Sequence, residues 1–217
     1  MTWFSDETLS FLRDLSQNNN RVWFQENKPR YEAHIKDAAA QFADALNQRL
    51  AATYATGVTS RIFRMQRDLR FSKDKTPYNT HIHIGFADSQ TGASWMVGLQ
   101  TEHLVVGFGI FAFAHDALDL WREAVAGPQG EILQVLHAQA TSDGLRISDP
   151  ELKRVPMAWN ADHPHGDLLR HKGIVWWNDH VQQREVMGPD GPSMIADELR
   201  AMEPLRNWMT LALDPST

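Results

Sequence analysis

A cationic segment holds the residues of this chain whose types and spacing best suit chemistry. Six basic side chains fall between Arg61 and Lys75, against the two acids Asp68 and Asp74, so the segment carries a charge of +4 in a chain of net charge −6. Arginine binds phosphates and carboxylates through paired hydrogen bonds, and lysine adds a compact point charge. The basic segment 64–75 therefore predicts a site for a small anionic ligand, phosphorylated compounds included. The expected ligand-binding side chains are Arg64, Arg67, Arg70, Lys73, Lys75 and Tyr78.

The same residues also allow a structural reading. On a strand, Arg67 would lie among apolar neighbours, and an unpaired buried charge is very costly. Asp68, Asp74 or acids of the first helices could pair with Arg67 and Arg70 and hold the segment in place. A purely structural Arg/Asp network is therefore the alternative to an anion site, because both would produce the same pattern of basic and acidic residues.

Two histidines follow the basic segment on the next predicted strand. His81 and His83 share one strand face, and an imidazole beside arginines can act as a general acid or base near neutral pH. If the protein is an enzyme, these are the expected catalytic residues. His163 and His165 could join them around a metal, but the Pro164 between them favours a helix start, so no metal site is predicted.

Common catalytic motifs do not occur in the sequence. There is no G-x-S-x-G, no P-loop, no G-x-G-x-x-G and no cysteine, which excludes thiol nucleophiles and cysteine-ligated metals. The pair Gly107-x-Gly109 favours close backbone packing at a strand end over a phosphate-binding turn. The residues indicate no particular cofactor and no oligomeric state, and they suit an enzyme or a binding protein.

Helices are predicted before and after a central sheet. Ser5 or Asp6 can cap a first helix, the asparagines at 18–20 break it, and apolar residues at three- and four-residue spacing over 31–50 predict an amphipathic helix. Pro204 predicts a kink in the last helix. The later predicted helices span 114–125, 131–140, 164–171 and 193–213.

The middle of the chain predicts antiparallel strands. In 80–86, Ile82, Ile84 and Phe86 alternate with polar or small residues, and 94–100 and 103–109 continue a meander, with a later strand at 173–177. The stretch 61–71 fits a helix or a strand, and the strand is favoured because a glycine precedes it and a turn follows. Residues 1–217 therefore form a predicted single α+β domain, with a mainly antiparallel central sheet flanked by N-terminal and C-terminal helices.

Composition and charge limit the kinds of partner to expect. The chain is 42% hydrophobic and 22% charged, as in globular proteins, and it lacks the start of a signal peptide and any apolar run of ~18 residues. We expect a cytoplasmic protein with no membrane partner. A net charge of −6 disfavours nucleic acid, which needs a broad basic surface. The alternative to a small ligand is an interaction module whose basic segment docks an acidic protein or a nucleic-acid backbone.

Residues 67–78, R-D-L-R-F-S-K-D-K-T-P-Y, closely resemble the signature of a microbial family catalogued as domain of unknown function DUF2461. One departure is Asn79, where a basic residue is more usual. The family has no established activity, so the resemblance implies a kind of protein and no reaction. The likeness spans nearly the whole chain, through further segments at 11–15, 19–24, 28–31, 152–156, 162–165 and 168–173.

Overall fold

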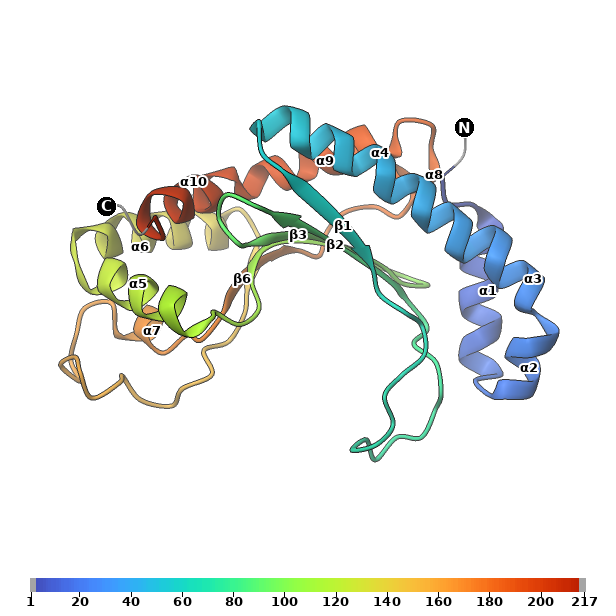
Figure 1. Ribbon diagram of the computed structural model, residues 1–217, viewed down its shortest axis with the longest axis horizontal. Helices are drawn as coiled ribbons and strands as arrows, with labels where there is room; N and C mark the ends of the chain where they lie inside the picture. Colours follow the sequence, from blue (N-terminus) through green and yellow to red (C-terminus); the bar gives the residue numbers. More distant parts are fainter. Residues whose placement is uncertain (1–2, 215–217) are drawn as a thin grey trace.

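A computed structural model describes residues 3–214 of the chain. Within these residues six strands form one antiparallel sheet in the order β1-β2-β3-β4-β6-β5. Helices precede and follow the sheet strands in the chain (Figure 1). The predicted α+β class, with an antiparallel sheet between N-terminal and C-terminal helices, is confirmed.

The N-terminal helices break where the sequence predicts. At the start of α1 (Asp6–Gln17), the Ser5 N–H donates to the Thr8 hydroxyl at 3.1 Å. At the start of α2 (Arg21–Glu26), the side chain of Asn20 accepts a hydrogen bond from the Trp23 N–H at 3.0 Å. Such caps satisfy amide groups that the first helical turn leaves without partners. The next elements are α3 (Lys28–Tyr31), the π-helical turn η1 (Glu32–Lys36) and α4 (Asp37–Tyr54).

The predicted strand periodicity of the central sheet is confirmed in β2. Ile82, Ile84 and Phe86 are buried, whereas His83 is exposed. A Cβ atom at Gly109 would collide with the β6 backbone, so close packing explains the paired glycines. The strands are β1 (Val58–Ile62), β2 (Ile82–Asp88), β3 (Ser94–Leu99), β4 (Leu104–Ile110), β5 (Arg146–Ile147) and β6 (Ile174–Asn178).

The C-terminal helices cover the sheet and extend beyond one end of it. α9 runs beside α4, α10 continues from α9 toward α6, and α5, α6 and α7 gather near β6 (Figure 1). The predicted last helix divides at a 3-10 turn, η2 (Arg200–Met202), just before Pro204, which has no N–H to continue a helical ladder. The other helices are α5 (His115–Ala126), α6 (Pro128–Ser142), α7 (Gly166–Leu169), α8 (Arg184–Met187), α9 (Gly191–Leu199) and α10 (Glu203–Ala212).

A buried ion pair joins α10 to the sheet. The Arg206 Nε donates to the Asp88 carboxylate at 2.9 Å, and both residues are almost wholly buried. The hydroxyls of Thr56 and Thr91 donate to the same carboxylate at 2.8 and 3.1 Å, and the guanidinium lies 4.6 Å from the ring centroid of Tyr54. Two buried charges are tolerated here because each is paired and hydrogen-bonded.

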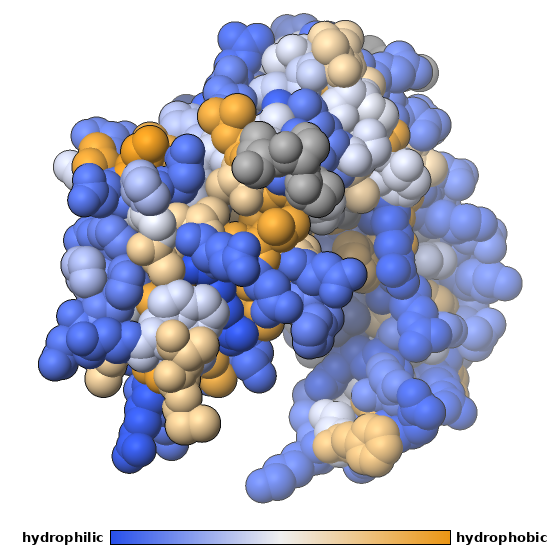
Figure 2. Space-filling model, turned by 60° about the vertical axis from the view of Figure 1, so that its left-hand side comes forward, coloured by the Kyte–Doolittle hydropathy of each residue, from blue (hydrophilic) through white to orange (hydrophobic). Residues whose placement is uncertain are grey.

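Residues 63–81, called the arm below, leave the sheet between β1 and β2. Figure 1 shows the arm as a long projection, and Figure 2 shows it at the lower right, hydrophilic over most of its surface. The predicted strand over 61–71 is therefore wrong beyond Ile62, where β1 ends. Phe63 and Phe71 have the alternation of a strand, but neither is buried: Phe63 is 48% exposed and Phe71 is 95% exposed.

Candidate functional site

Asn19 fixes the base of the arm to the turn between α1 and α2. Its side-chain Nδ2 donates to the Tyr78 carbonyl at 2.8 Å, and its Oδ1 accepts from the Tyr78 N–H at 3.0 Å. The two limbs of the arm also meet at an antiparallel bridge between Gln66 and Tyr78. These contacts hold the arm beside α2, so residues of the arm and of α2 line the same groove.

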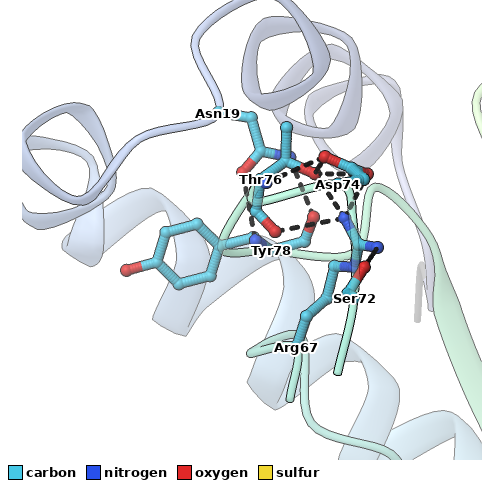
Figure 3. Close-up of polar contacts among 6 residues, drawn as sticks. All are labelled: Asn19, Arg67, Ser72, Asp74, Thr76 and Tyr78. Atoms are coloured by element: carbon cyan, nitrogen blue, oxygen red, sulfur yellow. Dashed lines mark hydrogen bonds and ion pairs between the residues drawn. The ribbon is translucent and has the colours of Figure 1, made fainter. Parts of the chain in front are cut away.

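Tyr78, a predicted ligand-binding residue, serves mainly as packing. Its ring is buried and stacks on Phe24, with ring centroids 4.0 Å apart. Figure 3 shows its phenol directed away from the polar cluster around Arg67. Its side chain nevertheless lines a groove between the arm and α2.

Arg67 is engaged inside the arm, as the structural reading predicts. Its guanidinium donates to the Asp74 carboxylate at 2.5 Å and to the hydroxyl and carbonyl oxygens of Thr76 (Figure 3). The pKa of Asp74 is lowered to about 2, mainly because the Thr76 N–H donates to its carboxylate and next because Arg67 does. Arg67 therefore organises the turn, although it also lines the neighbouring grooves.

Two further predicted ligand-binding cations have internal partners. Arg70 forms a bidentate pair with Asp68, with its Nε 3.0 Å from Oδ1 and its terminal nitrogen 2.6 Å from Oδ2. This pair lowers the pKa of Asp68, to which the charge of Arg64 adds a smaller effect. Lys75 donates to the Leu69 carbonyl at 2.9 Å. Lys73 is exposed, and neither lysine lines the grooves beside the arm.

Arg64 lies at the junction of two grooves. The α2 groove, of about 670 Å³, runs between the arm and α2 and includes Arg21, Arg64, Arg70 and Tyr78. The sheet groove, of about 610 Å³, lies on the side of β1 and β2 and includes Arg61, Arg64, His81 and His83. Arg67 and Asp68 border both.

Three of the arginines that line these grooves lack acidic partners. No carboxylate of residues 3–214 forms an ion pair with Arg21, Arg61 or Arg64. The Arg61 guanidinium instead lies 5.0 Å from the ring centroid of Phe63. Sequence reasoning named Arg64 but missed Arg21, which reaches the site only because Asn19 joins the arm to the start of α2.

His81 and His83 lie side by side in the sheet groove. Their ring centroids are 4.0 Å apart at an interplanar angle of 26°, as expected for one strand face. Burial lowers the pKa of His83 to about 4, with a smaller effect from His81, although His83 keeps an exposed edge. Burial also lowers the pKa of His81, with a further effect from the charge of Arg67. Both rings are therefore neutral at pH 7, and each keeps one basic nitrogen.

Across residues 3–214, no three histidine, aspartate or glutamate side chains come close enough together to hold a metal ion. The sheet groove thus offers the unpaired guanidinium groups of Arg61 and Arg64 beside two neutral imidazoles. Such a set can bind an oxyanion and can accept a proton near it.

Comparison with protein families identifies the chain. Residues 7–208 match the family described as "Conserved hypothetical protein (DUF2461)". The chain therefore belongs to this family, which confirms the resemblance, and the match includes the arm and both grooves. A comparison with curated proteins finds no match. In the part of the chain that the structure describes, no helix combines the length and the apolar character needed to cross a bilayer.

Proposed function

We propose that the protein binds a small anionic ligand at the base of the arm, with Arg64 as the central contact. The observation that supports this most directly is that Arg64 borders both grooves without an acidic partner, while its neighbour Arg67 is held by Asp74. Arg21 lines the α2 groove and Arg61 lines the sheet groove. Guanidinium groups suit a phosphoryl or carboxylate group because they bind it through two parallel hydrogen bonds.

Within this proposal, the sheet groove is the place for chemistry. It combines Arg61 and Arg64 with the neutral imidazoles of His81 and His83, whereas the α2 groove has no histidine. His81 and His83 are accordingly the candidate general bases toward a bound phosphorylated or carboxylated substrate. The volume of about 610 Å³ falls within the range of about 300–1,000 Å³ typical of small-molecule sites.

Titration calorimetry with inorganic phosphate, glycerol phosphate and citrate tests the binding. We expect Arg64→Ala to weaken the best of these ligands about 10- to 100-fold, because a hydrogen bond to a charged group contributes about 1.5–3 kcal/mol. Arg49→Ala removes an equal charge from an exposed position on α4, outside both grooves, and serves as the matched control. Equal losses in the two variants, or no binding to the wild type, would refute the proposal.

A second candidate function is supported by the exposed end of the arm. Phe71 is 95% exposed, with the Arg70 guanidinium 6.0 Å from its ring centroid, and the arm projects from the body (Figure 1). An exposed aromatic ring among cations suits docking to an acidic protein surface. In this case Phe71→Ser would reduce binding of a poly-glutamate peptide, and that binding would fall steeply with salt. Stronger binding of an oligonucleotide of equal charge would point to nucleic acid instead.

A further inference from the structure

A second group of histidines surrounds a cavity at the opposite end of the sheet from the arm. The cavity measures about 340 Å³ and lies among α6, the segment that follows β5, and the residues around α7. The helices α5, α6 and α7 occupy this end at the left of Figure 1. Its wall includes His137, His165, His171, Asp149 and Arg170.

Two of these imidazoles are buried and have fixed tautomers. His171 is 3% exposed, and its Nδ1 lies 3.0 Å from the Gly173 carbonyl oxygen. A carbonyl oxygen only accepts, so Nδ1 carries the hydrogen and the neutral ring keeps its lone pair on Nε2. His165 is 7% exposed, and its Nδ1 donates to the side-chain oxygen of Gln134 at 2.7 Å. Its lone pair is therefore also on Nε2. Neither Nε2 has a hydrogen-bond partner among residues 3–214.

Burial keeps two imidazoles of the cavity wall in the neutral form, which can accept a hydrogen bond. Burial lowers the pKa of His137 and of His171; His171 lowers that of His137 further, and the charge of Arg170 lowers that of His171. Asp167 opposes both shifts, and Glu151 also opposes that of His171. The imidazoles of His137 and His171 are therefore neutral at pH 7, and the exposed carboxylate of Asp149 adds a negative charge to the lining. A wall of neutral imidazoles and a carboxylate suits a hydrogen-bond donor, above all an ammonium group.

The adjoining pocket has the opposite character. It measures about 460 Å³, shares Pro164, Asp167 and Arg170 with the histidine cavity, and includes Lys153 and Arg154. No acid in the described part of the chain forms an ion pair with Lys153 or Arg154.

Arg170 stands between the two pockets. One of its terminal nitrogens donates to Asp167 at 2.7 Å, and its Nε is buried with no hydrogen-bond partner among the described residues. A buried donor without a partner is costly, so this Nε favours an added acceptor.

We propose that these adjoining pockets form a binding site for a small zwitterion, such as a free amino acid, with its ammonium group in the histidine cavity and its carboxylate toward Arg170, Lys153 and Arg154. The arrangement separates acceptors from cations along one continuous surface, as the two ends of such a ligand require. The site is independent of the arm. Its residues come from different elements, and it shares none with the two grooves.

Titration calorimetry with three matched probes tests the ligand class: alanine, ethylamine and propionate, followed by larger amino acids with their amine and acid analogues. We expect at least one amino acid to bind about tenfold or more tightly than either analogue, because only the amino acid engages both ends. Equal binding of an acid analogue, or binding of Zn²⁺ in place of any amino acid, would overturn the proposal.

Two variants locate the binding. His171→Asn keeps a side-chain donor for the Gly173 carbonyl but removes the Nε2 acceptor, and we expect it to weaken the amino acid about tenfold. His115→Gln, at an exposed position on α5, is the matched control. The Lys153→Ala, Arg154→Ala double variant changes only exposed side chains and should weaken binding without affecting folding. Unchanged affinity in both test variants would exclude this site, while Arg64→Ala should leave amino acid binding intact.

Discussion

The side-chain amide of Asn19 pairs with the backbone of Tyr78 through a donor and an acceptor at once, as a neighbouring strand would. This contact spans 59 residues of sequence and is the means by which the start of α2 meets the arm. Because of it, Arg21 and Arg64 face one groove. The proposed anion site thus depends on a residue that lines neither groove.

Replacing Asn19 with alanine should loosen the arm. The loss of two hydrogen bonds should cost about 1–2 kcal/mol of folding free energy and speed hydrogen exchange at the Tyr78 amide. Phosphate affinity should also fall, because Arg21 and Arg64 would no longer be held at the same groove. Urea denaturation and hydrogen–deuterium exchange measure these effects. Asn18→Ala is the control, because the Asn18 side chain donates only to Asp14 within its own helix end. Unaltered exchange at Tyr78 would contradict the role given to Asn19.

Neutralising Asp68 should strengthen anion binding. Asp68→Asn removes the carboxylate that engages Arg70 and attracts Arg64, so both guanidinium groups become more available. We expect the phosphate dissociation constant to fall about three- to tenfold at low salt, with the difference shrinking as salt rises. Asp44→Asn makes the same charge change at an exposed position on α4. An equal gain in that control would show that only net charge matters.

The stacked histidines predict a pH dependence of stability. Because the pKa of His83 is about 4 when folded and about 6.5 when unfolded, the unfolded chain binds the proton first as pH falls. Stability from this group is therefore complete above about pH 6.5 and is lost as pH falls toward 4. NMR titration of the imidazole resonances gives the pKa directly.

Two variants separate the causes of that shift. His81→Gln should raise the pKa of His83 only part of the way, because burial is the larger cause and the charge of His81 the smaller. His83→Gln should flatten the fall in melting temperature between pH 6.5 and 4. A His83 midpoint near 6.5 in the wild type would disprove the arrangement.

Removing Asp88 should destabilise the fold strongly. Asp88→Ala leaves Arg206 buried without its carboxylate, which typically costs about 3–5 kcal/mol. Urea denaturation should therefore show a much lower midpoint, whereas Asp44→Ala on the exposed face of α4 should have little effect. The Asp88→Ala, Arg206→Met double variant should be more stable than Asp88→Ala alone, since no charge is left unpaired. A double variant no better than the single one would argue against this explanation.

Local patterns predicted those parts of the fold that depend on local rules. Alternation located β2 through Ile82, Ile84 and Phe86, and Asn20 and Pro204 marked real interruptions between helices. The pairing of Arg67 with Asp74 was also among the predicted alternatives. Each of these features follows from residues that are close in sequence, where periodicity and side-chain chemistry suffice.

The features that sequence reasoning missed depend on contacts between distant segments. Phe63 and Phe71 alternate as in a strand, yet no layer of the protein covers them, so the sheet ends and the arm begins. Arg21 belongs to the groove only through the Asn19 contact, and the sequence marked Asn19 only as part of a helix break. His137 lies on a helix with no recognisable motif and meets His171 only through the tertiary fold.

The position of β1 at the edge of the sheet has a consequence for self-association. An edge strand offers unpaired backbone groups to a second copy of the chain, a common route to aggregation. Here the exposed edge is five residues long, includes Arg61, and passes directly into an arm crowded with positive charge. Two copies approaching through their β1 edges would bring like charges together, which disfavours edge-to-edge pairing at this strand.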